Sequence, residues 1–216
     1  MDELRDAYDT IAVAYDEQLR DELSHKPLDR ALLTALTELA GEGTIADVGC
    51  GPGHVTRFLA GLHPDVLGVD LSPKMIAIAR RHAPRIPGTV ASMLALPVGD
   101  SAWAGAAAMY SIIHLGAAER ARAFAELARV LRDGAPLLVA FHIGDEPVHL
   151  TTWFGADVDV DVHFLDPVAV RADLVAAGFD VVAELTREPL DPAEFPSRRA
   201  YLMAMIHKPG GAWQGP

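Results

Sequence analysis

The chain has one cysteine, few basic residues and no long hydrophobic run, and each shortage excludes a class of protein. Cys50 has no partner for an intrachain disulfide, so we expect a reducing, cytoplasmic setting. No apolar run approaches the roughly 20 residues of a membrane span, and the polar, acidic start of the chain is unlike a signal peptide. We therefore expect no membrane partner.

The charge balance is acidic, with 18 Lys and Arg residues against 30 Asp and Glu residues and a formal net charge of −12. Nucleic-acid affinity comes largely from Lys and Arg, so most of this surface would repel a phosphate backbone, and no nucleic-acid partner is expected. The histidines show no H-x-x-x-H, H-E-x-x-H or C-x-x-C spacing. No metal site is therefore expected either.

Helical and strand-like segments alternate along the 216 residues. Such alternation predicts an α/β fold with a mostly parallel sheet and helices on both faces. Helices are predicted at 1–20, 27–39, 55–62, 73–82, 117–131 and 167–177, and strands at 44–48, 66–69, 89–93, 104–111, 136–141, 157–164, 179–185 and 200–206. We expect one domain over 1–208, followed by a flexible Gly- and Pro-rich tail at 209–216.

The first strand-to-helix turn carries the strongest chemical signal. It reads Asp47-Val48-Gly49-Cys50-Gly51-Pro52-Gly53, and glycines there let the backbone approach a ligand closely. The dinucleotide pattern G-x-G-x-x-G fails, because His54 or Thr56 stands where its third glycine would be. Asp70 ends the next strand, where its carboxylate would accept both hydroxyls of a ribose; as a helix cap, Ser72 is better placed.

These residues resemble the motifs of the class I methyltransferases that use S-adenosylmethionine (SAM). The run 47–53 is similar to the family's acidic-x-G-x-G-x-G signature, and 66–72 to its ribose-binding motif. The runs 91–97, 110–115 and 131–135 resemble three further motifs in the same order, although Ser92 stands where the family usually has an acid beside adenine. The resemblance implies a Rossmann-like, doubly wound, seven-stranded sheet, mostly parallel with an antiparallel last strand.

The resemblance also implies SAM as cofactor, S-adenosylhomocysteine as product and a small molecule as methyl acceptor. The residues expected to bind SAM are Tyr8, Tyr15, Asp47, Gly49, Cys50, Gly51, Gly53, Asp70, Leu71, Ser72, Met75, Ser92, Met93, Leu94, Met109, Tyr110 and Ser111. Residues 1–40 would form a helical lid over the cofactor, and residues 143–165 an insert that caps the acceptor. Core packing is the alternative role for the two tyrosines of the first helix.

His114 and His142 are the candidate catalytic residues. Each follows a strand at the carboxyl edge of the sheet, where ligands of open α/β sheets gather. His114 is the first candidate for a base, since a neutral histidine suits that role near pH 7. The alternating run 157–164 is either a solvated edge strand or an acidic wall that selects a basic acceptor.

The predicted activity is transfer of a methyl group from SAM to a small-molecule acceptor by in-line displacement. A SAM-binding module without catalysis is the alternative from another class, and an oxidoreductase with a nucleotide cofactor is a weaker one. The chain is expected to act as a monomer or a homodimer. The sequence names neither the acceptor nor the atom that is methylated.

Overall fold

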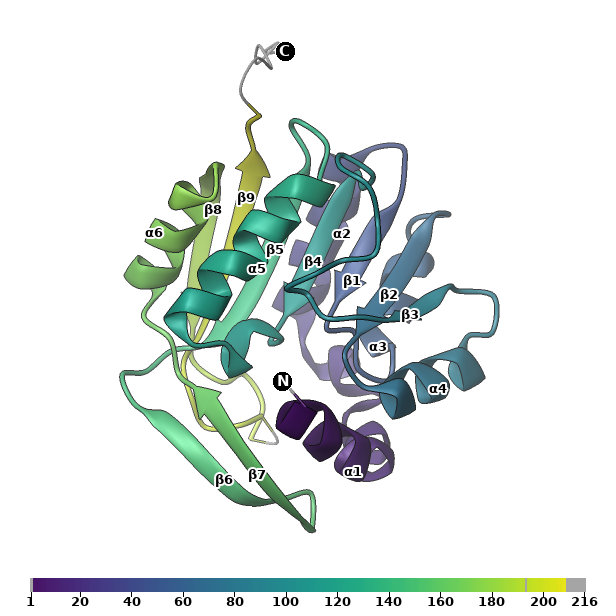
Figure 1. Cartoon of the computed structure of the whole chain (residues 1–216), viewed down its shortest axis with the longest axis vertical. Helices are drawn as coiled ribbons and strands as arrows, with labels where there is room; N and C mark the ends of the chain where they lie inside the picture. Colours follow the sequence, from purple (N-terminus) through teal and green to yellow (C-terminus); the bar gives the residue numbers. More distant parts are fainter. Residues whose placement is uncertain (1, 193, 209–216) are drawn as a thin grey trace.

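A computed structural model describes residues 2–192 and 194–208, in which helices and strands alternate (Figure 1). The helices are α1 (Asp2–Leu19), α2 (Pro27–Ala40), α3 (His54–Ala60), α4 (Pro73–His82), α5 (Ala117–Val130) and α6 (Pro167–Ala176), with short 3-10 helices η1 (Glu22–His25) and η2 (Ile112–His114). The strands are β1 (Ile45–Val48), β2 (Val66–Asp70), β3 (Gly88–Val90), β4 (Gly105–Met109), β5 (Pro136–His142), β6 (Pro147–Trp153), β7 (Ala156–His163), β8 (Phe179–Arg187) and β9 (Arg199–Ile206).

Seven of these strands form one sheet in the order β3-β2-β1-β4-β5-β9-β8. The pairs from β3 to β5 are parallel, whereas β9 runs antiparallel to both of its neighbours. The order turns back at β1 and β4, which is the kind of switch point where open α/β sheets bind ligands. The predicted seven-stranded sheet with an antiparallel last strand is confirmed.

The sheet is buried on both faces, and β5 shows why its sequence is continuously apolar. Leu137, Val139 and Phe141 face a core shared with α5 and α6, while Leu138 and Ala140 face a second core shared with α2 and α3. Successive side chains of a strand point to opposite faces, so a strand with helices on both sides needs apolar residues at every position. Figure 1 shows α5 and α6 in front of the sheet and α2 behind it.

A two-stranded hairpin of β6 and β7 stands apart from the main sheet, next to α1 (Figure 1). The predicted strand at 157–164 is confirmed as β7, but its partner β6 was not predicted. Phe154 and Gly155 join the two strands with φ angles of 49° and 76°. Positive φ at both central residues is typical of the tight turn that matches the twist of a hairpin.

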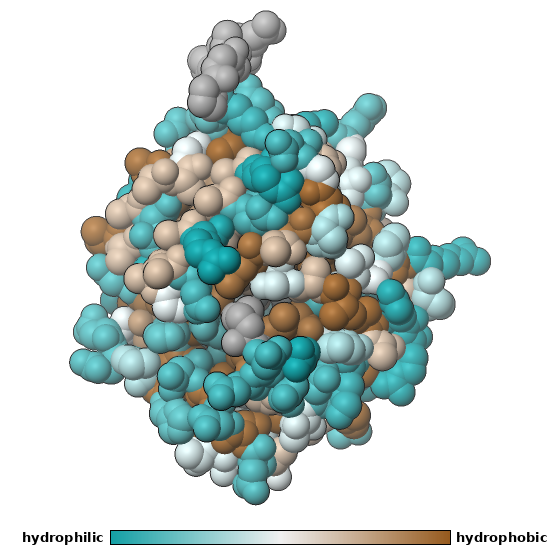
Figure 2. Space-filling view, in the orientation of Figure 1, coloured by the Kyte–Doolittle hydropathy of each residue, from teal (hydrophilic) through white to brown (hydrophobic). Residues whose placement is uncertain are grey.

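The surface shows mainly polar residues in Figure 2, with smaller apolar areas among them. In the described residues, no helix combines the length and the apolar character that a membrane span requires. Nor does any group of three or more His, Cys, Asp or Glu side chains in that part of the chain have an arrangement that could hold a metal ion. The predicted tail at 209–216 lies outside the described residues.

Asp16 ties α1 to the end of α4. Its carboxylate accepts hydrogen bonds from Nε2 of His82 at 2.9 Å and from Arg20 at 2.6 Å. Burial alone would raise the pKa of Asp16, but these hydrogen bonds outweigh it and lower the pKa. The stabilisation is therefore present above the ordinary Asp pKa of about 3.9 and is lost as pH falls through the lower folded value.

We expect Asp16→Asn to lower the free energy of unfolding by about 1.5–3 kcal/mol at pH 7, the range for hydrogen bonds to a charged group. The difference from wild type should shrink below about pH 4, and urea unfolding at both pH values measures it. Asp6→Asn is the matched control, because Asp6 lies on the same helix, is exposed and pairs with Arg5. Equal losses in the two variants would contradict the role of Asp16.

Candidate active site

The loop between β1 and α3 is shaped by three glycines in the left-handed region of backbone space. Gly49, Gly51 and Gly53 have φ angles of 76°, 53° and 83°, which L side chains rarely adopt. A Cβ at Gly49 would lie 2.2 Å from the Cβ of Ser111, in the segment after β4. The loop therefore lies directly on that segment, and only glycine fits at position 49.

Asp70, the last residue of β2, holds this loop. Its Oδ2 accepts the N–H of Gly51 at 2.8 Å, and its Oδ1 accepts the N–H of Ser72 at 2.8 Å. Ser72 is the helix cap, since its Oγ accepts the N–H of Met75 at 3.0 Å. Burial raises the pKa of Asp70 to about 6, although the bonds from Ser72 and Gly51 oppose the shift. The carboxylate keeps lone pairs that two hydroxyls of a ligand would use.

Asp47 and Cys50 are buried groups of the same loop. Oδ2 of Asp47 accepts the hydroxyl of Thr56 at 2.6 Å, and burial raises the pKa of Asp47 to about 6. Burial, helped by the charges of Asp47 and Asp70, raises the pKa of the Cys50 thiol well above its usual value. The thiolate is the reactive form of cysteine, so Cys50 is a packing residue of the loop and not a nucleophile.

Most of the predicted cofactor residues border two adjoining hollows at the carboxyl ends of β1, β2 and β4. These are Tyr8, Tyr15, Asp47, Gly49, Cys50, Gly51, Asp70, Leu71, Met93, Met109, Tyr110 and Ser111. Five predicted residues lie outside this lining. Gly53 approaches Ala79 of α4, Met75 is buried beside α1, Ser72 caps α4, and Oγ of Ser92 accepts the N–H of Leu94. We call the two hollows the cofactor pocket.

A hydrogen-bonded chain joins α1, η2 and β7. Nδ1 of His114 lies 2.9 Å from the carbonyl oxygen of Asp161, which only accepts, so Nδ1 carries the proton. Nε2 is then the acceptor, and the hydroxyl of Tyr8 donates to it at 2.6 Å. Burial lowers the pKa of His114 to about 4, which keeps the ring neutral at pH 7. Both ring nitrogens have protein partners, which favours a structural role for His114, and its predicted role as a base is untested.

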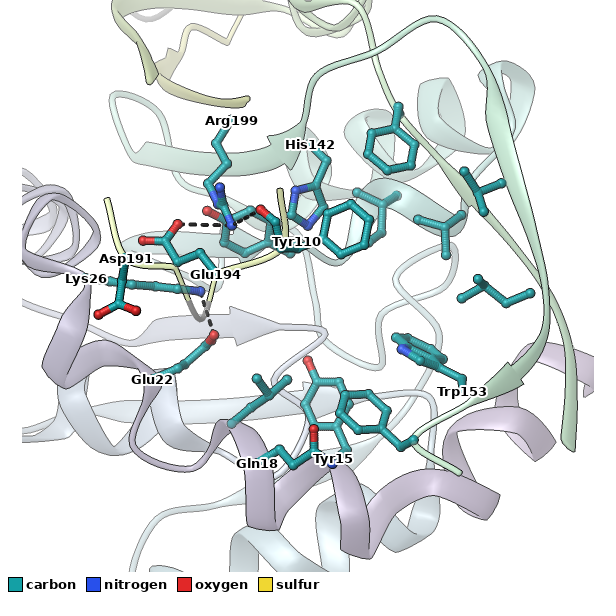
Figure 3. Close-up of a pocket in the computed structure, with 18 of the residues that line it drawn as sticks. Tyr15, Gln18, Glu22, Lys26, Tyr110, His142, Trp153, Asp191, Glu194 and Arg199 are labelled. Carbon is teal, nitrogen blue, oxygen red and sulfur yellow. Dashed lines mark hydrogen bonds and ion pairs between the residues drawn. The ribbon is translucent and has the colours of Figure 1, made fainter. Parts of the chain in front are cut away.

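A larger cavity of about 630 Å³ adjoins the cofactor pocket, and Tyr8, Tyr15 and Tyr110 border both. Its apolar wall comprises Ile113, Val148, Leu150, Trp153, Phe154, Val162, Phe164 and Phe195, and its polar end comprises Glu22, Lys26, His142, Asp191, Glu194 and Arg199. Figure 3 shows Tyr110 and His142 across this cavity from Tyr15. The volume is within the roughly 300–1,000 Å³ range of small-molecule sites. We call it the acceptor cavity.

Several residues of the acceptor cavity could not be identified from the sequence. Lys26, in the segment between η1 and α2, pairs with Glu22 at 2.5 Å and lies over the Tyr110 ring. Arg199 enters from the start of β9. In the sequence each is only a charged residue beside an apolar segment, a pattern that usually indicates a solvent-exposed face. His142 lines this cavity, whereas His114 borders the cofactor pocket.

The acidic residues of β7 do not face the acceptor cavity. Asp159 and Asp161 are exposed and pair with His149 on the same hairpin, while Val160 and Val162 are buried. Alternation along the strand places the carboxylates and the valines on opposite faces. The prediction of an acidic wall that selects a basic acceptor is therefore wrong, and the alternative of a solvated strand face describes β7.

Comparison with known proteins agrees with this geometry. Residues 45–134 match a family model described as a methyltransferase domain. An O-methyltransferase of Penicillium expansum is 32% identical over 167 residues, which cover 72% of this chain and 58% of the relative. A trans-aconitate 2-methyltransferase of Methylobacterium nodulans is 35% identical over 123 residues, covering 54% and 45%. The chain spans about half the length of the curated relatives it matches.

Solved structures show the same fold. A SAM-dependent methyltransferase of Methanosarcina mazei superposes with a TM-score of 0.72 at 17% identity, covering 82% of this chain and 97% of the other. A geranyl diphosphate C-methyltransferase of Streptomyces coelicolor, solved with S-adenosylhomocysteine, gives 0.64 at 14% identity, covering 81% and 75%. These structures show the fold; with the match to the methyltransferase-domain model and the O-methyltransferase relative, the chain belongs to the class I SAM-dependent methyltransferases.

Proposed function

We propose that the chain transfers the methyl group of SAM to a small molecule bound in the acceptor cavity. The observation that carries this proposal is that the cofactor pocket adjoins the acceptor cavity, with Tyr8, Tyr15 and Tyr110 bordering both. One curated relative is named for a small-molecule acceptor, trans-aconitate, and another is named an O-methyltransferase. We also propose a cytoplasmic location, on the single cysteine.

The residues of the cofactor pocket fit SAM. The Cβ-free surface at Gly51 leaves room for a ligand against the backbone. Asp70 would bind the ribose hydroxyls, and Met93 and Leu71 would lie against the adenine. SAM supplies an activated methyl group on a sulfonium. The chain then orients the acceptor in line with that methyl group, which is a large part of catalysis in such reactions.

Residues 1–40 and 143–165 are proposed as the lid and the cap of this site within a single domain over 1–208. α1 packs on α4 and β7, and Tyr8 and Tyr15 lie edge-on to Trp153 of β6, with ring centroids 5.4 and 6.3 Å apart. Aromatic rings suit a site that covers a sulfonium. Whether the chain is a monomer or a homodimer is measured by light scattering after size-exclusion chromatography.

The proposal is tested by titrating SAM into the chain by calorimetry and by measuring S-adenosylhomocysteine release with a panel of hydroxylated and carboxylated acceptors. SAM binding with turnover on at least one acceptor supports a methyltransferase. SAM binding without turnover on any of them would favour a binding module, and binding of NADH in place of SAM would favour an oxidoreductase.

Replacing His114 separates a structural role from a catalytic one. Because His114 is bonded to Tyr8 and Asp161, we expect His114→Ala to weaken SAM binding by less than about tenfold, in keeping with one neutral hydrogen bond. Turnover at saturating SAM should also fall by less than tenfold. A fall of roughly 10²–10⁴ with unchanged SAM affinity would identify His114 as the base instead.

A further inference from the structure

Two side chains at the polar end of the acceptor cavity are direct partners across paired strands. His142, the last residue of β5, lies opposite Arg199, the first residue of β9, in the antiparallel register. Directly opposed residues of an antiparallel pair share one face of the sheet, with Cβ atoms about 5 Å apart. Both line the cavity, and Figure 3 shows them side by side next to Tyr110.

Arg199 has one nitrogen without a partner in the described residues. Its terminal nitrogens donate to the carbonyls of Ser197 and Phe195 and pair with Glu194 at 3.0 Å. These contacts fix the guanidinium of a side chain that is 2% exposed. Nε is buried, and within the described part of the chain it has no acceptor. Buried donors normally have one, so this atom indicates an oxygen that a ligand supplies.

His142 is held in place beside it. Its Nδ1 shares a hydrogen bond of 2.7 Å with Oγ of Ser197, and none is found for Nε2 in the described residues. Burial and the charges of Arg199 and Lys26 lower the pKa of His142 to about 3, with Arg187 acting in the same direction and Glu22 against them. The ring is therefore neutral at pH 7, with the positive charges of Arg199 and Lys26 close enough to act on it.

Two of the carboxylates nearby, Glu194 and Glu22, are already paired. Glu194 binds both Arg187, at 2.8 Å, and Arg199. Glu22 binds Lys26 at 2.5 Å and His54 at 2.8 Å. Each of the two carboxylates therefore has two nitrogen-bearing partners. Because of this pairing, each repels an anion at the Nε of Arg199 less than an unpaired carboxylate would.

Three aromatic side chains surround the ring of His142. Its ring centroid lies 5.0 Å from that of Tyr110, 5.9 Å from that of Phe164 and 5.5 Å from that of Phe195. Trp153 lines the same cavity from the hairpin. Aromatic side chains at these separations pack well against another aromatic ring.

We propose that Arg199 and His142 bind the ionised hydroxyl of a planar aromatic acceptor, a phenolate, and present it for methylation. This inference rests on the proposed function. The phenolic proton passes to water when the acceptor binds, and the oxygen stays anionic against the Nε–H of Arg199. In the transfer, the O–C bond forms as the S–C bond breaks, and the electron pair remains on sulfur. The products are an aryl methyl ether, S-adenosylhomocysteine and the proton already released.

The test uses 4-nitrophenol as the probe and 4-nitroanisole, its methyl ether, as the matched ligand that cannot ionise. The full chain is titrated with each at a pH where free 4-nitrophenol is mostly protonated, and the longer-wavelength absorbance of the phenolate reports ionisation. We expect bound 4-nitrophenol to absorb as the phenolate and to bind about ten- to a hundredfold more tightly than the ether, as for a hydrogen bond to a charged group.

Three variants locate the effect. Arg199→Lys keeps the positive charge but lacks Nε–H, Arg199→Gln removes the charge, and His142→Phe keeps a ring while removing both nitrogens. Each should reduce the preference for the phenol over the ether by about tenfold. Arg171→Gln is the control, because the Arg171 side chain is 43% exposed and pairs with Glu184 away from this cavity. Thermal melts identify any variant that does not fold, and His142→Phe carries the test if both Arg199 variants fail.

The outcomes separate this inference from the proposed function, because SAM is titrated into the same samples. Phenolate binding that depends on Arg199 or His142 supports the inference, even in a chain that does not bind SAM. Equal affinity for the phenol and the ether, or an unchanged preference in folded Arg199 and His142 variants, overturns it while SAM binding remains intact.

Discussion

Gly49→Ala is expected to abolish measurable SAM binding, with a loss of affinity of at least about a hundredfold. The added Cβ would lie 2.2 Å from the Cβ of Ser111 and 2.9 Å from its Oγ, at a backbone φ of 76°. The left-handed conformation costs roughly 1–2 kcal/mol for an alanine, and overpacking costs roughly 1–3 kcal/mol more. Together these are about 2–5 kcal/mol, which the loop relieves only by moving away from the cofactor pocket.

Two further variants distinguish the clash from the backbone strain. Gly51→Ala has a similar φ of 53°, but its Cβ would lie 3.8 Å from Tyr15, an ordinary contact distance. It should therefore cost only the roughly 1–2 kcal/mol of strain in urea unfolding. Gly49→Ala combined with Ser111→Gly removes the Cβ that is struck and should regain part of the lost affinity. Normal SAM binding by Gly49→Ala alone would disprove this account of the loop.

The sequence predicted the parts of the fold that local patterns determine. Pro27 and Pro73 begin α2 and α4 as expected, because proline suits the first turn of a helix. The continuous apolar runs form buried strands, as predicted. The glycine-rich run 47–53 forms the turn between the first strand and the following helix, also as predicted. The predicted strand at 89–93 shortened to β3 (Gly88–Val90), at the edge of the sheet.

The missed features depend on contacts between distant segments. β6 was not predicted because only one of its residues after Pro147 and Val148 is a large aliphatic, Leu150, and it becomes a strand by pairing with β7. The bond between Tyr8 and His114 joins residues 106 positions apart. In the sequence Arg199 is an ordinary charged residue. Only the pairing of β9 with β5 places it beside His142. Neither propensity nor periodicity contains that information.

The two histidines illustrate the same limit at the level of function. Position at the carboxyl edge of the sheet selected both His114 and His142, and both are indeed at that edge. The sequence could not tell that Tyr8 would lie between His114 and the acceptor cavity, nor that His142 would line that cavity. The difference arises from α1 and from the β6–β7 hairpin, which are far apart in the sequence and both lie at this edge of the sheet.

Asp70→Asn is expected to weaken SAM binding by at least tenfold, because a hydrogen bond to a charged group contributes roughly 1.5–3 kcal/mol. Asparagine keeps the shape of the side chain but loses the charge, and it offers one acceptor oxygen where Asp70 offers two. Asp65→Asn is the matched control, since Asp65 is exposed before the start of β2 and binds Thr44. Calorimetric titration of SAM into both variants measures the difference.

The same carboxylate should make SAM binding depend on pH. Burial raises the pKa of Asp70 to about 6, so wild-type affinity should fall as pH drops below about 6 and Asp70 takes up a proton. Because its folded pKa lies above the unfolded value, protonation of Asp70 favours folding; this contribution is fully present below the unfolded pKa of about 3.9 and is lost as pH rises through the folded pKa of about 6. Titration of Asp70 therefore predicts weaker binding at low pH without unfolding.

Asp47 also has its pKa raised to about 6 by burial, so the pH profile of wild type alone would not identify the group. The titrating group is identified by comparing the SAM affinities of wild type, Asp47→Asn and Asp70→Asn between pH 5 and pH 7.5. We expect the pH dependence to persist in Asp47→Asn, because the Asp47 carboxylate of the wild type already accepts the Thr56 hydroxyl. We expect it to flatten in Asp70→Asn. An Asp70→Asn chain that still loses affinity below about pH 6, or that binds SAM as tightly as wild type, would remove Asp70 from the ribose site.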